Sequence, residues 1–251
     1  MATNDIQAYL FPTPNAKKVT IALEELNIPY DGHFVNLRKK EQFAPEFLKI
    51  SPNNKIPAVL DLHPPKEIGE GSLSVFESAA ILQYLAEHRA GPGAPELYPK
   101  DPRKRVKVNE WLAWQISGLA PTMGQAYKFK DIGGEPYTKY AEETKRLFQV
   151  LDKRLGEYPY IAGEKYSIAD IASYPWAVLY PEATKDDTPY PNVKAWLERV
   201  GSRPAVKRGI ERLDALQTMA ADHIVKVLRH LFCARNHTDD MSDPVTGENH
   251  R

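Results

Sequence analysis

Thr13, Pro14 and Asn15 form a motif that could hold an anion at the start of a helix. Threonine before proline is a common helix start, since the hydroxyl caps the helix and proline fits its first position. Capping leaves Asn15 unexplained, because asparagine is a poor helix former. The unpaired N–H groups and positive potential of a helix N-terminus favour a bound anion such as a thiolate. The motif therefore has two interpretations, a cap alone or a cap with Asn15 and Thr13 as thiolate-stabilising groups.

Typical interaction energies are large enough for Asn15 and Thr13 to stabilise a thiolate without a metal ion. A free thiol has a pKa of about 8.5, and lowering it by roughly two units requires about 2.7 kcal/mol of preferential thiolate stabilisation. A hydrogen bond to a charged group contributes about 1.5–3 kcal/mol, and a helix terminus adds about 0.3–1 kcal/mol. One Asn or Thr donor at the helix tip is therefore sufficient. The thiol would come from a ligand, because the only cysteine, Cys233, lies near the C-terminus, away from these motifs.

Lys55, Ile56 and Pro57 form a second candidate binding segment. Proline at the start of a strand usually marks no more than a sheet edge. A cis bond before Pro57, which about 5% of X–Pro bonds adopt, would turn the N–H and C=O of Ile56 outward. These groups could then pair with the backbone of a bound peptide, as an added strand does. Both interpretations stay open for this segment taken alone.

Glu77 and Ser78 form the third motif, at the start of a helix that directly follows a strand. Helix capping is the simpler interpretation. The alternative is a ligand site in which the hydroxyl and N–H of Ser78 receive a carboxylate and Glu77 binds an ammonium group. A γ-glutamyl group carries those two charges side by side.

The elements around these motifs change character along the chain. Short apolar runs alternate with helical patterns at first, which is typical of α/β units, and predict strands at 7–11, 30–35, 57–62 and 73–76 and helices at 15–26, 45–50 and 78–88. A stretch rich in Pro and Gly follows at 90–102. Beyond it only helical patterns appear, at 103–119, 137–155, 167–179, 193–202 and 205–216.

These patterns predict two domains and a tail. We expect an α/β domain at 1–90, a linker at 91–101, an all-helical domain at 102–217, and an amphipathic helical extension with a polar tail at 218–251. Ser167 and Asp170 fit a structural capping box. Several aromatic residues of the helical domain are expected mostly in the core, with the remainder lining an acceptor pocket: Trp111, Trp114, Tyr127, Phe129, Tyr174 and Trp176.

Composition narrows the class of protein. Acidic and basic residues balance at 33 each, so no global charge attracts nucleic acid or an anionic membrane. No segment approaches the roughly 18 apolar residues that cross a bilayer, and we expect a cytoplasmic protein. A single cysteine excludes a disulfide framework. The histidines predict no metal site, because His223, His230 and His237 repeat every seven residues, whereas helical chelating pairs sit four apart.

Taken in order, T-P-N, N-K-I-P-A-V and F-E-S-x-A-I-L resemble the thioredoxin-like half of glutathione transferases. The run 41–57 is similar to the class typified by the yeast nitrogen-regulation prion protein and bacterial glutathione-dependent disulfide reductases. In the helical half, W-Q at 114–115, G-L-A-P at 118–121 and Y-S-I-A-D-I-A at 166–172 match the same class. The resemblance covers about residues 5–217. It implies a glutathione transferase fold, with an α/β thioredoxin-like N-terminal domain and an all-α C-terminal domain.

The resemblance also implies roles for individual residues. Asn15, with Thr13 beside it, corresponds to the group near the glutathione sulfur. The other implied contacts are Gln42 to the glycyl end, Ile56 with its neighbours Lys55 and Pro57 to the cysteinyl backbone, Glu77 and Ser78 to the γ-glutamyl group, and Lys139 across a dimer interface. Tyr9 competes as the thiol activator, because a tyrosine near this strand serves other classes. We rank Tyr9 below Asn15, since an aromatic residue in mid-strand is more simply explained by packing.

The implied activity is that of an enzyme that uses glutathione as cosubstrate. Its thiolate would attack a small disulfide, a peroxide or an electrophilic carbon, and Asn15 favours disulfide reduction over conjugation. A second glutathione would resolve the mixed disulfide, and the class implies a homodimer. The competing hypotheses are a non-catalytic regulator that binds a transcription factor and a scaffold subunit of a translation complex. Both would keep the fold and bind a protein partner.

Overall fold

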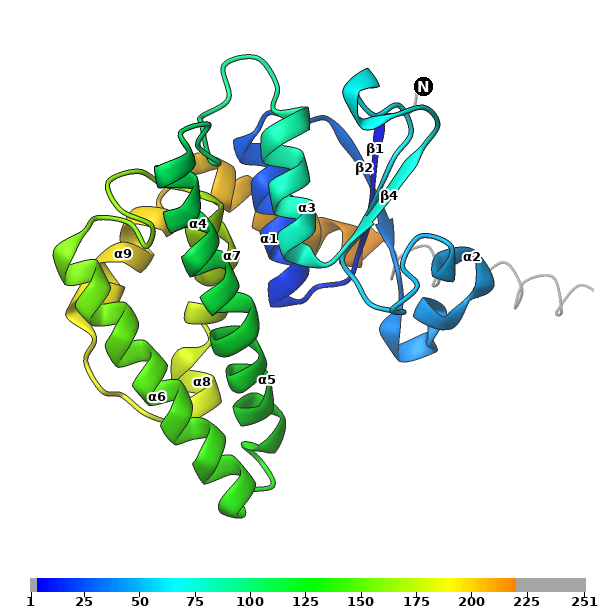
Figure 1. The fold of residues 1–251 in the computed structure, drawn as a ribbon. Coiled ribbons are helices and arrows are strands. Elements are labelled where there is room, and N and C mark those ends of the chain that lie inside the picture. The colour runs from blue at the N-terminus through cyan, green and yellow to red at the C-terminus, as the bar shows by residue number, and fades with distance from the viewer. Residues whose placement is uncertain (1–3, 220–251) are drawn as a thin grey trace, which may run out of the picture.

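The computed structural model describes residues 4–219, which form a sheet flanked by helices and a helical half beside it (Figure 1). The strands are β1 (Ile6–Leu10), β2 (Tyr30–Phe34), β3 (Ala58–Asp61) and β4 (Leu73–Phe76). Their order is β2-β1-β3-β4, with β1 and β2 parallel and the other pairs antiparallel. The four expected strands are confirmed, and each of their ends lies within one residue of the prediction. The mixed sheet and the helical half confirm the predicted fold class.

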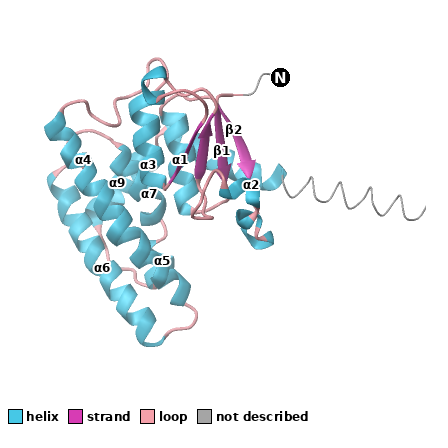
Figure 2. Ribbon diagram, turned by 45° about the vertical axis from the view of Figure 1, so that its right-hand side comes forward, coloured by secondary structure: helices cyan, strands magenta, loops and turns pink. Residues whose placement is uncertain are grey.

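Helices cover both faces of this sheet. The helices on the side of the helical half are α1 (Pro14–Glu25) and α3 (Ser78–Tyr84), which continues as a π-helical turn, η4 (Leu85–Arg89). The opposite side carries α2 (Pro45–Leu48) and the short turns η1 (Leu37–Lys39) and η2 (Glu41–Phe43), while η3 (Lys66–Ile68) precedes β4. Figures 1 and 2 show α1 and α3 between the sheet and the helical half.

The helical half contains α4 (Pro102–Trp114), η5 (Gln115–Leu119), α5 (Ala120–Phe129), α6 (Gly134–Glu157), α7 (Ile168–Ala177), α8 (Tyr180–Thr184), α9 (Pro191–Gly201) and a helix at 204–219. The apolar spacing that predicts these helices is clearest in α6, which buries Leu147, Leu151 and Leu155 along one face. Within residues 4–219 no helix combines the length and the apolar character that a membrane span requires. The predicted extension at 218–251 and Cys233 lie almost entirely outside the described residues.

Two helices differ from the prediction. The helix expected to end near residue 119 does not stop there, because η5 leads directly into α5. Gly118, Pro121 and Gly124 signal a break in the sequence, but Pro121 lies in the first turn of α5, just after the π-helical turn η5, a local irregularity at which a helix can accommodate proline. The short α8 was also not expected, and it likewise has a proline in its first turn.

Ion pairs between arginine and glutamate residues link the helical half to α1. Arg203 donates two hydrogen bonds to the buried Glu25, at 2.6 and 2.8 Å. Arg208 and Arg212 both donate to Glu24. The helix at 204–219 also approaches closely, since a Cβ at Gly209 would lie 2.7 Å from the backbone nitrogen of Ile21. The two halves therefore share one packed interface along α1.

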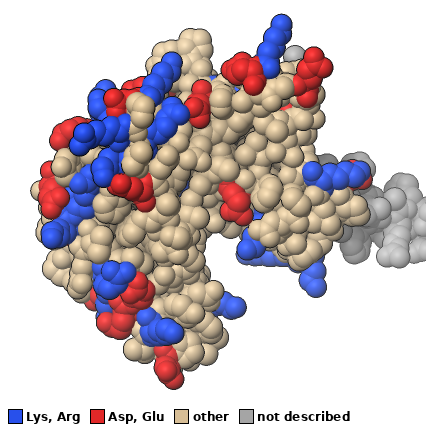
Figure 3. All heavy atoms as spheres, in the orientation of Figure 1, with Lys and Arg blue, Asp and Glu red and all other residues tan. Residues whose placement is uncertain are grey.

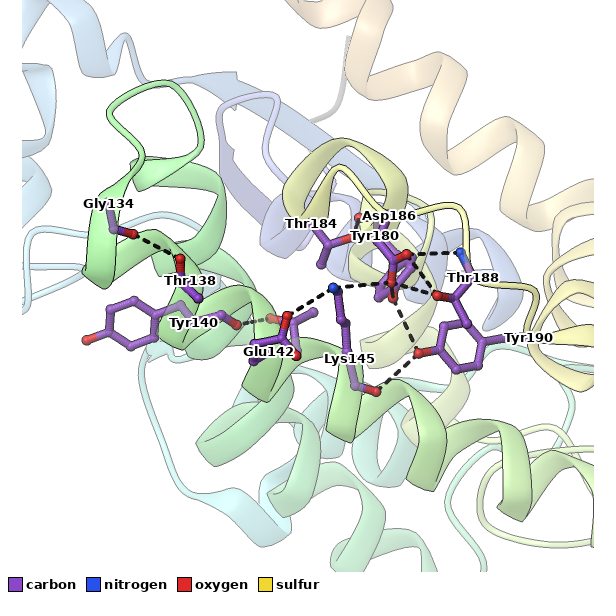
Figure 4. Close-up of polar contacts among 11 residues, drawn as sticks. Gly134, Thr138, Tyr140, Glu142, Lys145, Tyr180, Thr184, Asp186, Thr188 and Tyr190 are labelled. Atoms are coloured by element: carbon purple, nitrogen blue, oxygen red, sulfur yellow. Dashed lines mark hydrogen bonds and ion pairs between the residues drawn. The ribbon is translucent and has the colours of Figure 1, made fainter.

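A polar cluster fixes the chain that follows α7 (Figure 4). The hydroxyl of Tyr180 donates to Asp186 at 2.7 Å, and the Tyr190 hydroxyl donates to the Lys145 carbonyl at 3.3 Å. Lys145 on α6 lies 3.8 Å from the Asp186 carboxylate. These contacts tie α8 and the loop after it to α6. They thereby hold the C-terminal end of α7 in place.

The capping box at the start of α7 is confirmed and extends into a buried network. The Asp170 carboxylate accepts from the N–H groups of Ile161 and Ser167, from the Ser167 hydroxyl and from the indole N–H of Trp196, all at 2.9–3.1 Å. Burial raises the pKa of Asp170 to about 6, against the opposing effect of these donors. At neutral pH an ionised carboxylate therefore accepts four hydrogen bonds inside the core.

Replacing Asp170 by Asn should lower the free energy of unfolding by about 3 kcal/mol. The carboxamide turns its own N–H groups toward donors and leaves some of them buried without an acceptor. Urea unfolding followed by circular dichroism measures the change. Asp187→Asn, at an exposed position, is the control and should shift the same quantity by less than about 0.5 kcal/mol. Equal small effects in both variants would contradict a stabilising role for the network.

Candidate functional site

The N-terminus of α1 opens toward a cleft between the two halves. Thr13 is the N-cap, with extended backbone, and its Oγ1 accepts from the N–H of Ala16 at 3.2 Å. Pro14 occupies the first helical position. The predicted cap is therefore confirmed, and it places Asn15 in the first turn with its side chain at the cleft.

Trp176 on α7 fixes the orientation of the Asn15 amide. Its indole Nε1 donates to Asn15 Oδ1 at 2.9 Å. Because an indole N–H can only donate, the amide oxygen must face Trp176, and the amide NH₂ turns to the other side. Asn15 is thus held with its donor available to an anion.

Polar side chains of the sheet half line one side of this cleft and residues of the helical half line the other, and we call it the polar cleft. Its volume is about 400 Å³, and its lining residues are Asn15, Lys18, Lys55, Glu77 and Ser78 from the sheet half and Ile116, Ala120, Pro121, Gly124, Gln125 and Trp176 from the helical half. A side pocket of about 140 Å³ shares Asn15, Lys55, Glu77 and Ser78 and adds Ser51, Ile56, Pro57 and Phe76. The structure thus brings together seven of the predicted site residues when Thr13 at the helix tip is included.

The backbone at this site has two special features. The peptide bond between Ile56 and Pro57 is cis, the alternative that the sequence left open. Glu77 has φ 69° and ψ 117°, a conformation that residues with a Cβ rarely adopt. The chain therefore holds the Glu77 carboxylate at the cleft through a strained backbone.

A buried lysine, Lys18, lies beside these residues and was not predicted. Its Nζ donates to Gln115 Oε1 at 2.8 Å and to Ser78 Oγ at 3.3 Å. Burial lowers the pKa of Lys18 to about 7, and the negative charge of Glu77 opposes that shift. The sequence signal was its spacing, three residues after Asn15 and therefore on the same face of α1.

A second, more apolar pocket shares Trp176 with the polar cleft. Its volume is about 510 Å³, and it is lined by Pro12, Thr13, Pro14, Lys17, Gly124, Tyr127, Tyr174, Pro175, Trp176, Val178, Leu179, Ile210 and Asp214. Trp176 and Gly124 line both cavities. Three of the aromatic residues expected to divide between core and acceptor pocket, Tyr127, Tyr174 and Trp176, lie here. A ligand group bound near Asn15 could therefore meet a second molecule in this apolar pocket.

Three predicted residues do not line these cavities. Gln42 on η2 is half-buried, and its Oε1 has no hydrogen-bond partner in the described chain. Lys139 on α6 is exposed, and the roles given to Gln42 and Lys139 stay predictions. The ring of Tyr9 stacks on His33 with centroids 4.8 Å apart, and burial raises the pKa of its phenol. This packing supports the ranking of Tyr9 below Asn15.

The charge pattern around the site is mixed. In the space-filling view the molecule is hollowed between the sheet half and the lower part of the helical half, and interspersed acidic and basic residues cover the outer face of the latter (Figure 3). Among residues 4–219 no three His, Cys, Asp or Glu side chains group as metal ligands. The donors of the cleft instead include the Asn15 amide, the Ser78 hydroxyl and the two lysines Lys18 and Lys55, which suit an anionic organic ligand.

Glu77→Gly should be more stable than Glu77→Ala by about 1 kcal/mol, because glycine adopts a positive φ without the steric cost that alanine pays. Both variants lose the carboxylate, so their comparison isolates the backbone. Thermal or urea unfolding of the two proteins measures the difference. Ala79→Gly, inside α3 where φ is negative, is the control and should destabilise by about 1 kcal/mol instead. A Glu77→Ala protein as stable as Glu77→Gly would contradict the strain.

Comparison with known proteins bears on both halves of the chain. The family model described as "Glutathione S-transferase, N-terminal domain" matches residues 13–88, and "Glutathione S-transferase, C-terminal domain" matches residues 124–204. The disulfide-bond oxidoreductase YfcG of Escherichia coli K12 is 46% identical over 209 residues, which is 82% of this chain and 94% of YfcG.

Two solved structures show the same fold. A glutathione transferase family member from Pseudomonas fluorescens, with two glutathione bound, matches with a TM-score of 0.75 and 42% identity over 83% of this chain and 93% of that one. A glutathione transferase from Pseudomonas putida, with one glutathione disulfide per subunit, matches with a TM-score of 0.74 and 38% identity over 82% and 91% of the two chains.

Proposed function

Since the chain belongs to the glutathione S-transferase family, we propose that it is a glutathione-dependent enzyme that reduces disulfides. The observation that carries this proposal is the convergence of Asn15, Glu77 and Ser78 on one cleft. Glu77 and Ser78 match the ammonium and the carboxylate of the γ-glutamyl end, and Asn15 matches the cysteinyl thiolate. YfcG, named a disulfide-bond oxidoreductase, supports the reaction type.

The polar cleft and its side pocket offer groups that complement the charges and the backbone of glutathione. The γ-glutamyl ammonium pairs with Glu77, and the adjacent carboxylate accepts from the hydroxyl and N–H of Ser78. The cysteinyl backbone pairs with Ile56 beside the cis bond, with Lys55 and Pro57 flanking it. This arrangement directs the sulfur toward Asn15 at the helix tip.

The thiolate of bound glutathione is stabilised by Asn15, by the Thr13 hydroxyl and by the positive end of α1. Trp176 keeps the amide NH₂ of Asn15 turned toward the sulfur. The thiolate attacks one sulfur of a disulfide in the apolar pocket, forming a mixed disulfide and releasing the other sulfur as a thiolate that takes up a proton. A second glutathione then attacks the mixed disulfide, giving glutathione disulfide and the second free thiol. The ligands of the two Pseudomonas proteins, two glutathione and one glutathione disulfide, fit this scheme.

We extend the proposal to the finer predictions. The same thiolate reduces peroxides and attacks electrophilic carbon, and the chain acts as a homodimer in the cytoplasm, where glutathione is kept reduced. Gln42 contacts the glycyl end of glutathione, and Lys139 reaches across the dimer interface. The domain boundaries at 90 and 102 belong to the proposal as well.

Asn15→Ala should lower kcat/KM for a small glutathione mixed disulfide by about 10- to 100-fold, the equivalent of one hydrogen bond to a charged atom. The pKa of the bound glutathione thiol should rise toward the free value of about 8.5. Turnover coupled to glutathione reductase measures the first quantity, and the ultraviolet absorbance of the thiolate measures the second. Tyr9→Phe is the matched control and should change neither. Loss of activity in Tyr9→Phe with Asn15→Ala unaffected would make Tyr9 the activator.

Trp176→Phe should reduce the same kcat/KM by about three- to tenfold, because phenylalanine keeps an aromatic wall but lacks the N–H that orients Asn15. The effect should vanish in the Asn15→Ala background, where no amide remains to be oriented. The four proteins of this cycle are assayed together. Additive losses would mean that Trp176 acts independently of Asn15.

A further inference from the structure

Lys18 is a cation enclosed in the protein at the innermost part of the polar cleft. Its exposed fraction is 1%, yet its hydrogen-bond partners among the described residues, Ser78 and Gln115, are both neutral. The other buried charge of α1, Glu25, receives two hydrogen bonds from Arg203. Burying a cation without a negative partner destabilises the folded protein. A ligand anion at the cleft would offset that cost.

The contacts of Lys18 connect it to the residue assigned to the γ-glutamyl carboxylate. Its ammonium donates to Ser78 Oγ at 3.3 Å and to Gln115 Oε1 at 2.8 Å. These acceptors are neutral, and an ammonium has three N–H groups. The amide NH₂ of Gln115 also lacks an acceptor among the described residues. The surroundings of Lys18 are therefore rich in hydrogen-bond donors and poor in negative charge.

Protonation of Lys18 decides which way the Ser78 hydroxyl points. When Lys18 is charged, it donates to Ser78 Oγ, and the hydroxyl hydrogen must turn elsewhere, where it can donate to a ligand. When Lys18 is neutral, its nitrogen can accept the hydroxyl hydrogen instead. The charged state therefore prepares Ser78 for an anion and adds a positive charge behind it.

We propose that Lys18 is the proton-coupled counter-charge of the γ-glutamyl carboxylate, so that glutathione binding takes up a proton at Lys18 Nζ. This inference rests on the proposed function, because it assumes that glutathione is the ligand of the cleft. The carboxylate binds the charged form, and a neutral Lys18 gains H⁺ from solvent as the anion arrives. Lys18 acts both directly, by its charge, and through Ser78.

Other charges do not fill this role. The charged groups that share the cleft with Lys18 are Lys55 and Glu77, and Glu77 is committed to the ligand's ammonium. On α3, η4 and α7, which pack against α1, the titratable groups are Tyr84, which donates to Asp61; Glu87, which pairs with Arg105; His88; Arg89, which pairs with Asp5; Asp170, in its own network; and Tyr174. The helix at 204–219 carries Lys207, Glu211, Asp214 and the arginines Arg208 and Arg212, which pair with Glu24, while Arg203 just before it pairs with Glu25. Burial is the main cause that lowers the pKa of Lys18 to about 7, and Glu77 alone among charged groups opposes it.

Calorimetry with S-methylglutathione tests the inference, because this ligand keeps the γ-glutamyl group and has no thiol proton to release. Titrations at about pH 7.5 in two buffers of different ionisation enthalpy count the protons that accompany binding. With a pKa of about 7, wild type should take up about 0.8 proton per site there and close to none at about pH 6. The affinity should weaken about tenfold between about pH 6 and about pH 8.

Substitutions of Lys18 distinguish the effect of its charge on binding from an effect on folding. Lys18→Arg stays charged at every pH, so it should bind S-methylglutathione without proton uptake and with an affinity that is flat between about pH 6 and about pH 8. Lys18→Met should bind more weakly, also without uptake. Lys194→Met, an exposed lysine of α9, is the control and should behave as wild type. Circular dichroism establishes which variants fold, and the wild-type titrations stand without them.

Binding of S-methylglutathione by wild type with no proton uptake at about pH 7.5 would overturn the role of Lys18 and leave the proposed function intact. Uptake that persists in Lys18→Arg or Lys18→Met would assign the proton to another group and also overturn it. If neither S-methylglutathione nor reduced or oxidised glutathione binds at any pH, the proposed function is overturned together with this inference.

Discussion

The site depends on the burial of α1 between the sheet and the helical half. Eight of its twelve residues are buried, so the helix cannot move without disturbing both halves. Its N-terminus opens at the cleft, and its first two turns carry Thr13, Asn15 and Lys18 in succession. At its other end, Glu24 holds the helix at 204–219 through Arg208 and Arg212, and Glu25 holds the segment just before that helix through Arg203. One rigid element thus sets the position of the anion-stabilising groups and the relation between the halves.

The sequence predicted the sheet half well, because its strands and helices follow clear apolar periods and its motifs occur at element boundaries. The cap at Thr13, the capping box at Ser167 and the placement of Glu77 at a strand end needed only local information. Contacts between distant segments were less accessible: the bond from Trp176 to Asn15 joins residues 161 apart in sequence. No local rule pairs them. The error at α5 has a similar origin, since Pro121 and Gly124 break helices in general but sit where packing tolerates them.

Several groups at the cleft carry a local energetic cost. Glu77 adopts a positive φ, and among the described residues Lys18 has only neutral hydrogen-bond acceptors and the buried amide NH₂ of Gln115 has no acceptor. Elsewhere the buried charges are satisfied, as Asp170 is by four donors. A strained backbone and a buried charge with only neutral partners, lying in the same cleft, are typical of a functional site, where the ligand supplies the missing partners. A zwitterionic γ-glutamyl group supplies an ammonium for Glu77 and an anion for the donors around Ser78.

The two cavities divide the proposed reaction into parts that need opposite environments. A charged tripeptide is bound best among polar groups, whereas sulfur exchange with an organic disulfide is favoured where water is excluded. Trp176 lines both cavities, and its N–H donates to Asn15. A thiolate held at Asn15 therefore lies at the boundary, stabilised on one side and close to its target on the other. Because the chain contributes donors and charges, and the sulfur arrives with the ligand, the oxidised product can leave and a fresh thiol can replace it without any repair of the protein.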